Sequence, residues 1–202
     1  MKPKIILASA SPRRSGLLQQ IGLEFEVIPA NIKEDININI SHEELVKKLA
    51  EEKAENVAKR LKEGIVIGAD TIFVLGKERI GKPKNKKDAI RVLKRMSGKM
   101  QEVYSGVAII NAKTGKKVVD SEITKIKVRK LSDEEIEHYV NTGEPLDKAG
   151  AIAIQGLGAI FVSKIDGCSS NVVGLPLYNL YKNLKKFGVN LFEFEKWKNY
   201  IK

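Results

Sequence analysis

Residues 5–15 constrain the fold more than any other stretch of the sequence. Residues 5–7 form an apolar run that is typical of a buried strand, and the polar residues after them end it. Ser11 suits the N-cap of a helix, and Pro12 suits the first helical position, where a missing N–H costs nothing. We therefore predict that a strand passes through a tight turn into the N-terminus of a helix.

Two arginines, Arg13 and Arg14, fall in the first turn of this predicted helix. Free N–H groups and the positive end of the helix dipole favour an anion there, so these cations do not stabilise the helix itself. Paired guanidinium groups at such a place indicate a polyphosphate site, and two solvated arginines are the alternative. The stretch has no glycine-rich run and no Gly-Lys-Ser/Thr, which excludes a P-loop mechanism.

The composition limits the classes of protein. A chain of 202 residues is long enough for a single domain over residues 1–202, or for one domain folded as two lobes around a cleft. The formal net charge of +11 suggests an anionic partner, although abundant Lys, Glu and Ile also suit a thermophile. The lysines are spread over predicted helix faces without interleaved aromatic residues, so a nucleic-acid partner is not favoured.

The expected location follows from three absences in the sequence. No apolar stretch is long enough to span a bilayer, and the N-terminus runs directly into a strand without a signal peptide. The single cysteine, Cys168, excludes an internal disulfide and suits a reducing compartment. We expect a cytoplasmic protein with no membrane partner.

Apolar periodicity and capping residues predict the remaining elements. Strands are expected over 25–28, 65–69, 72–75, 103–110, 118–128 and 159–162, and helices over 41–64, 85–96, 132–143 and 177–187. The tail residues Phe192, Phe194 and Trp197 are expected to pack on the core.

Two charged residues break these apolar patterns. Lys53 lies on the apolar stripe of the helix over 41–64, where it is either functional or snorkels so that its ammonium group reaches water. Asp70 has apolar residues on both sides, and such a buried acid is costly unless it is paired or bound to a metal. Gly68 and Ala69 before it leave room for the close approach of a ligand.

Further charged residues lie at the ends of predicted elements. Glu34 belongs to a polar loop, and Lys82 stands between a glycine and a proline in extended backbone. Carboxylates beside several cations fit a hard divalent cation, Mg²⁺ or Mn²⁺, that bridges phosphates, so Glu34 and Asp70 are the candidate metal ligands. His42 and His138 fall on predicted helix surfaces, which does not support a histidine triad or a zinc site.

Six sequence blocks together resemble the Maf family of nucleoside triphosphate pyrophosphatases, from about residue 5 to residue 187. The blocks are Ser9-x-Ser11-Pro12-Arg13-Arg14, Gly68-Ala69-Asp70-Thr71, Gly81-Lys82-Pro83, Asp147-Lys148-Ala149-Gly150, Ile154-Gln155-Gly156 and Asn171-Val172-Val173-Gly174-Leu175-Pro176. The resemblance implies a mixed α/β fold with an elongated mixed sheet, flanking helices and two lobes around a central cleft, similar to inosine triphosphate pyrophosphatases. It also implies metal-dependent hydrolysis between the α and β phosphates, which removes unwanted nucleotides.

The resemblance also implies roles for individual residues. Asp70 matches the family's general base, and we expect Lys53 and Lys82 to assist catalysis. Residues expected to bind the substrate are Ser9, Ser11, Arg13, Arg14, Thr71, Lys148 and Gln155. Of these, Arg13, Thr71 and Gln155 match positions that select the base, and their form resembles the branch that prefers dTTP and UTP.

Two other functions stay open at this point. One is a pyrophosphatase for inosine, xanthosine or modified nucleoside triphosphates, and the other is a basic nucleic-acid-binding protein whose binding would collapse with salt. A homodimer also stays open.

Overall fold

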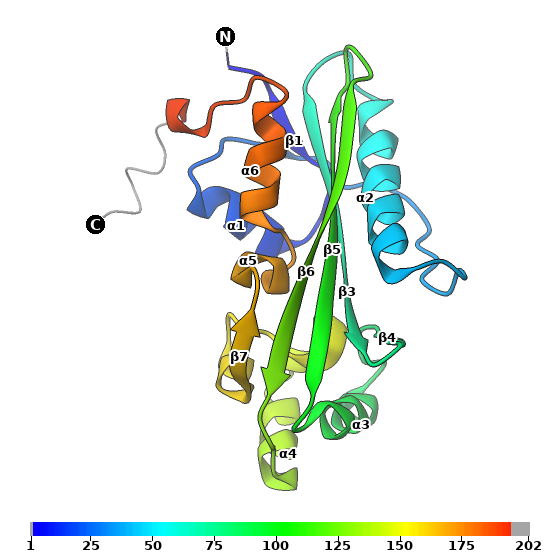
Figure 1. Cartoon of the computed structure of the whole chain (residues 1–202), viewed down its shortest axis with the longest axis vertical. Helices are drawn as coiled ribbons and strands as arrows, with labels where there is room; N and C mark the ends of the chain where they lie inside the picture. The colour runs from blue at the N-terminus through cyan, green and yellow to red at the C-terminus, as the bar shows by residue number, and fades with distance from the viewer. Residues whose placement is uncertain (1, 195–202) are drawn as a thin grey trace. The chain divides into compact units, whose positions relative to one another are not determined.

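The computed structural model describes residues 2–194 and has a mixed α/β fold, as predicted (Figure 1). The chain forms two compact units. The first comprises the chain up to Asp70, Ser105–Glu122 and the chain from Gly174, and the second comprises Thr71–Tyr104 and Ile123–Val173. The cleft and the single domain over residues 1–202 stay predictions.

The described part of the chain contains strands, α-helices and short 3₁₀ helices. The strands are β1 (Ile5–Leu7), β2 (Glu26–Val27), β3 (Ile65–Leu75), β4 (Glu78–Ile80), β5 (Met100–Asn111), β6 (Lys117–Val128) and β7 (Val162–Asp166). The α-helices are α1 (Pro12–Gln20), α2 (His42–Ala58), α3 (Lys86–Met96), α4 (Asp133–Asn141), α5 (Ser169–Val173) and α6 (Leu177–Lys185). The 3₁₀ helices are η1 (Glu144–Asp147), η2 (Ala149–Ala151), η3 (Leu157–Phe161) and η4 (Leu191–Glu193).

The strands of residues 2–194 form one mixed sheet in the order β2-β1-β3-β5-β6-β7, with β4 paired to β3. Strand β1 is parallel to both of its neighbours, whereas β4 and β7 pair antiparallel. Strands β3, β5 and β6 contribute residues to both compact units.

Opposite faces of the first unit's strands are covered by different helices. The chain passes from β1 to β2 through α1 and returns across β1 to β3 through α2. Because right-handed connections that run in opposite directions leave from opposite faces, α1 and α2 lie on different sides of the strands. Figure 1 shows α2 on one side, with α1 and α6 on the other.

Helix α2 lies unusually close to the sheet because two strand positions carry no side chain. A Cβ atom on Gly68 would lie 2.2 Å from the carbonyl oxygen of Ala50, and one on Gly106 would lie 2.0 Å from that of Val46. Gly68 therefore makes room for the backbone of α2. The interpretation of Gly68 as space for a ligand is wrong.

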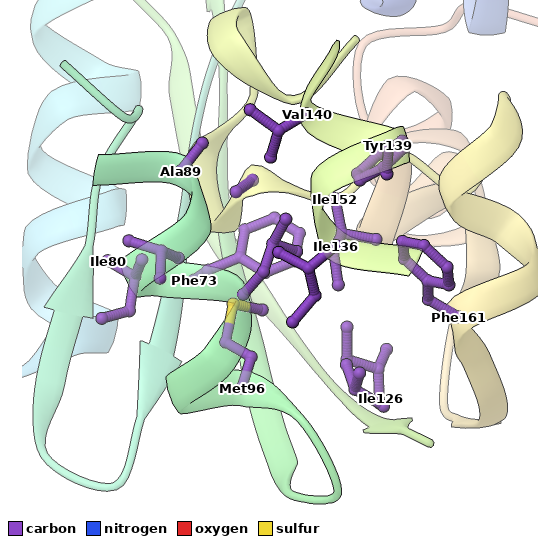
Figure 2. Close-up of a cluster of buried hydrophobic side chains, with 14 of the residues drawn as sticks. Phe73, Ile80, Ala89, Met96, Ile126, Ile136, Tyr139, Val140, Ile152 and Phe161 are labelled. Carbon is purple, nitrogen blue, oxygen red and sulfur yellow. The ribbon is translucent and has the colours of Figure 1, made fainter. Parts of the chain in front are cut away.

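The second unit has its own hydrophobic core, which Figure 2 shows. Phe73 of β3 and Ile80 of β4 pack there with Met96 of α3 and with Ile136 of α4. Tyr139 of α4 also belongs to this cluster and is 1% exposed. This core holds α3 and α4 in place within the second unit.

Most predicted helices begin where the capping residues indicate. The side chains of Ser41, Asn85 and Ser132 each accept the N–H of the residue three positions later. Helix α1 also begins at Pro12, but the Ser11 side chain makes no capping hydrogen bond. Helix α2 ends at Ala58, before the predicted stop at Gly64.

The predictions for three strands are wrong in part. The strands expected over 65–69 and 72–75 form one strand, β3, because an ion pair allows Asp70 to stay in it. The strand expected over 159–162 is mostly the 3₁₀ helix η3, since its first N–H groups donate to Glu144.

The expected packing of the tail holds for one of its aromatic residues. Phe194 is 3% exposed, whereas Phe192 is 78% exposed. Trp197 lies outside the described residues. No helix among the described residues is long and apolar enough to cross a membrane.

The close approach of α2 generates a stability prediction. We expect Gly106→Ala to lower the free energy of unfolding by about 1–3 kcal/mol, because the new methyl group overlaps the backbone of α2. Chemical denaturation measures this change. As the control, Gly16→Ala in α1 meets no atom within 4 Å, so it should raise stability by about 0.5–1 kcal/mol. Equal stability of Gly106→Ala and the wild type would contradict the packing.

Candidate active site

The carboxyl end of β1 is the first place at which the sequence-predicted residues meet. Leu7 is the last residue of β1 and pairs with Ile67, while β3 continues past it to Asp70. The connections from β1 and toward β3 leave on opposite faces, which makes this a topological switch point of parallel strands. Ligands of open α/β sheets bind outside the carboxyl ends of strands at such points.

Asp70 is buried at this end of the first unit, with 6% of its surface exposed. Residues two apart on a strand share a face, so Asp70 faces the same side as Gly68 and points toward α2. A buried carboxylate needs a partner. Its partner is Lys53, whose Nζ donates to Oδ1 of Asp70 at 2.6 Å.

Lys53 joins two carboxylates. Its Nζ lies 2.6 Å from Asp70 Oδ1 and 2.8 Å from Glu34 Oε1. The Lys53 side chain is only 10% exposed, whereas that of Glu34 is 46% exposed. The snorkelling interpretation of Lys53 is therefore wrong, because the ammonium group ends on carboxylates inside the unit.

Arg14 is held by two hydrogen bonds near the carboxylates of Asp70 and Glu34. Its Nε donates to the carbonyl oxygen of Gly174 at 2.9 Å, and its Nη1 donates to Ser9 Oγ at 3.0 Å. Burial lowers the pKa of Arg14, while attraction by Asp70 and Glu34 opposes that effect. Arg14 remains a cation at neutral pH, as arginine does in proteins, so it adds positive charge beside the two acids.

Ser9 and Ser11 shape the turn that leads from β1 into α1. Ser9 is 7% exposed, and its Oγ also accepts the N–H of Ser11 at 3.3 Å. Ser11 and Arg13 are half-buried at the start of α1. Because the Ser11 side chain does not cap the helix, the predicted anion does not compete with it for the N–H groups of the first turn.

The acids of this site fit a magnesium-like ion. No cluster of three or more His, Cys, Asp or Glu residues within residues 2–194 could hold a metal by itself. Mg²⁺ commonly uses one or two carboxylates together with substrate phosphates and water. Glu34 and Asp70 supply two carboxylates that already share a cation, the Lys53 ammonium group, and this donor set fits such an ion.

The other predicted residues belong to the second unit. Thr71 follows Asp70 in β3 and is half-buried, whereas Lys82 after β4 is exposed. The Lys148 ammonium group contacts the carboxylate of Asp147, and its side chain is 17% exposed. Gln155 is exposed in the turn before η3.

Sequence reasoning missed one contact at the first site and one acid of the second unit. The block over 171–176 was recognised, but no pattern indicated that the Gly174 carbonyl would hold Arg14, 160 positions away. Glu144 has no predicted role, yet its carboxylate accepts three hydrogen bonds. An acid directly after a glycine and before Pro145, inside a polar loop, was the available signal.

Comparison with known proteins shows that most of the chain is similar to one group of enzymes. A family model described as "Maf-like protein" matches residues 4–187. The dTTP/UTP pyrophosphatase of Desulforamulus reducens is 50% identical over 191 residues, which cover 95% of this chain and 100% of that relative. The enzyme of the same name from Acetivibrio thermocellus is 50% identical over 198 residues, covering 94% and 98%. That from Dictyoglomus turgidum is 49% identical over 192 residues, covering 95% and 100%.

The buried ion pair generates a prediction that does not depend on activity. We expect Lys53→Met to lower the free energy of unfolding by about 3–5 kcal/mol, because it leaves the buried Asp70 carboxylate unpaired. Adding Asp70→Asn should recover most of the loss, since no charge then stays buried. Urea denaturation of both variants measures the two effects.

Lys47→Met is the matched control for this pair. Lys47 pairs with Glu43 on the same helix, and their side chains are 37% and 45% exposed. Its loss should change stability by less than about 1 kcal/mol. If Lys53→Met were no more harmful than Lys47→Met, the Lys53–Asp70 pair would not be buried in solution.

Proposed function

The chain belongs to the family of Maf-like proteins, and from that premise we propose that it is a nucleoside triphosphate pyrophosphatase that prefers dTTP and UTP. It hydrolyses the bond between the α and β phosphates and releases the nucleoside monophosphate and pyrophosphate. The observation that carries this proposal is a sequence identity of 49–50% with proteins named dTTP/UTP pyrophosphatase, over almost their full length. Removal of unwanted nucleotides in the cytoplasm is the role that we propose for the reaction.

The proposed chemistry centres on Asp70. Its carboxylate takes a proton from water as the water oxygen forms a bond to the α-phosphorus. The bond from that phosphorus to the bridging oxygen breaks, and pyrophosphate leaves with the electron pair. Lys53 holds Asp70 in place at 2.6 Å, and its ammonium group adds positive charge near the phosphates.

Cations of the first turn of α1 complete the proposed phosphate site of the first unit. Arg14 is held by Gly174 and Ser9, so its guanidinium group is oriented before substrate arrives. Ser9, Ser11 and Arg13 add hydroxyl, backbone and guanidinium donors beside it. Such preorganised donors lower the energy of a transition state in which charge moves onto the leaving pyrophosphate.

A divalent cation, Mg²⁺ or Mn²⁺, is the proposed cofactor. Nucleotide pyrophosphatases of this family are generally metal-dependent. Glu34 and Asp70 would hold the ion, which would neutralise phosphate charge and help to activate water.

Residues of the second unit complete the proposal, on the basis of the family resemblance. Lys82 assists catalysis and Lys148 binds the substrate. Thr71 and Gln155, together with Arg13 of the first unit, select the base. The Gln155 amide offers one donor group and one acceptor, which is the pair needed to read the edge of uracil or thymine.

The alternatives make different predictions. A nucleic-acid-binding protein needs no metal and loses affinity steeply as salt rises, whereas the proposed enzyme turns over free nucleotides with metal. An inosine or xanthosine triphosphate pyrophosphatase differs only in the base that it prefers. A homodimer remains a candidate assembly for each of these.

Removal of the proposed base tests the reaction. We expect Asp70→Asn to lower kcat by about 10²–10⁴-fold, because an amide cannot accept the proton. Release of pyrophosphate from UTP with Mg²⁺ measures the rate. The matched control is Asp133→Asn, whose carboxylate is 75% exposed on α4 and should leave the rate unchanged. Near-normal turnover by Asp70→Asn would exclude Asp70 as the base.

A screen of nucleoside triphosphates tests the preference for the base. We expect kcat/KM for dTTP and UTP to exceed the values for dATP, GTP and ITP, because a wrong base, once bound, covers the polar groups that read the base and leaves them unpaired. Gln155→Ala should lower kcat/KM for dTTP and UTP by a larger factor than it lowers kcat/KM for the best purine substrate. A wild-type preference for ITP, XTP or 7-methyl-GTP would contradict the choice of base and leave the reaction itself intact.

A further inference from the structure

The carboxylate of Glu144 gathers three hydrogen bonds within the second unit. Its Oε1 accepts from the Tyr139 hydroxyl at 2.9 Å and from the N–H of Gly158 at 3.0 Å, and its Oε2 accepts from the N–H of Leu157 at 2.9 Å. These donors come from α4 and from the first two residues of η3. Glu144 therefore supplies the N-terminal cap of η3 from 13 positions earlier in the chain.

The backbone of this turn lies directly on the carboxylate. A Cβ atom on Gly156 would be 2.4 Å from Glu144 Oε2, and one on Gly158 would be 2.6 Å from the Tyr139 hydroxyl oxygen. Both glycines thus leave the space that the carboxylate and the phenol occupy. The turn cannot shift toward Glu144, and its N–H groups restrain it from moving away.

Tyr139, which donates to Glu144, belongs to the hydrophobic core of the second unit. The Tyr139 ring packs edge-on against Phe161 with 4.9 Å between ring centroids. Figure 2 shows both side chains in the hydrophobic cluster. Tyr139 and Phe161 are 1% and 2% exposed. The hydroxyl of Tyr139 is therefore fixed by packing, and it orients Glu144 in turn.

Glu144 carries a negative charge in this setting. Burial by itself would raise its pKa. The N–H donors of Gly158 and Leu157, the Tyr139 hydroxyl and the positive charge of Lys148 together outweigh that effect and lower the pKa below its ordinary value. Charged acceptors form stronger hydrogen bonds than neutral ones. The carboxylate thus holds the turn more firmly than an amide could.

Gln155 lies two positions before Leu157, the first residue whose N–H donates to Glu144, and it is itself exposed. We propose that Glu144 is a positioning residue that fixes the turn over 154–158, so that the Gln155 amide meets the base in one orientation. This inference rests on the proposed function, in which Gln155 selects the base. Glu144 acts through the backbone, and its oxygens already have partners, so it need not touch the nucleotide.

Glu144→Ala tests this role through the dependence of kinetics on the base. We expect kcat/KM for UTP to fall about 10-fold to 100-fold, mainly through KM, because the Gln155 amide loses its fixed place. kcat/KM for ITP should change much less, so the ratio of UTP to ITP falls. Inhibition by inorganic tripolyphosphate, which carries no base, should be unchanged.

Two further variants separate positioning from general damage. Tyr139→Phe removes one of the three donors and keeps the ring packing, so it should lower the same ratio by a smaller factor. Glu134→Ala removes an exposed acid from α4, 3.6 Å from His138, and should leave the ratio unchanged. Faster amide exchange at Leu157 and Gly158 in Glu144→Ala, with the remaining helices still protected, would show that only the turn loosens.

Acid titration checks that the charged contact exists in solution. Because the folded pKa of Glu144 is below its ordinary value of 4.5, its contribution to stability is present above pH 4.5 and is lost as the pH falls through the folded pKa. The difference in Tm between the wild type and Glu144→Ala should therefore be largest at neutral pH and shrink in acid. A difference that stayed constant with pH would contradict the contact.

The outcomes distinguish this inference from the function on which it rests. A wild-type enzyme that does not favour UTP over ITP would overturn the proposed base preference and this role together. A selective wild type with an unchanged ratio in Glu144→Ala would overturn the positioning role alone. An equal loss for UTP, ITP and tripolyphosphate would also overturn it, since that pattern indicates damage to the whole site.

Discussion

The burial of one negative charge governs the candidate site of the first unit. Asp70 is 6% exposed in the middle of a long strand, and an unpaired carboxylate there would cost several kcal/mol. Lys53 meets that requirement from the buried stripe of α2. A lysine on that stripe is tolerated because Asp70 faces it, and Asp70 is tolerated in the strand because Lys53 is there. The remaining charges assemble around this pair.

The geometry of the pair depends on how closely α2 approaches the sheet. Gly68 and Gly106 let the helix backbone come near the strands, so Lys53 reaches Asp70 and Glu34 without extending into water. Ser9 and Arg14 approach the same group from the carboxyl end of β1, where the connections of the parallel strands diverge. The proposed site for triphosphate hydrolysis thus depends on a helix that packs against strand positions without side chains.

Local patterns predicted much of this arrangement. The caps at Ser41, Asn85 and Ser132 act within a few residues, so the sequence alone locates those helix starts. Asp70 was recognised because a charge interrupts an apolar run. The strand predicted over 159–162 is mostly the 3₁₀ helix η3 instead, because the first N–H groups of η3 donate to a distant acid, Glu144, which no local pattern reports.

The sequence by itself determined which residues break their local patterns, and with them the family that the chain resembles and the candidate chemistry. Only the tertiary structure decided what those residues contact. It showed that Lys53 pairs with Asp70 and Glu34 instead of reaching water, and that Gly68 admits a helix instead of a ligand. The physical reason is that periodicity and capping depend on neighbours along the chain. An ion pair or a backbone contact depends on which segments the fold brings together, and that information is not local.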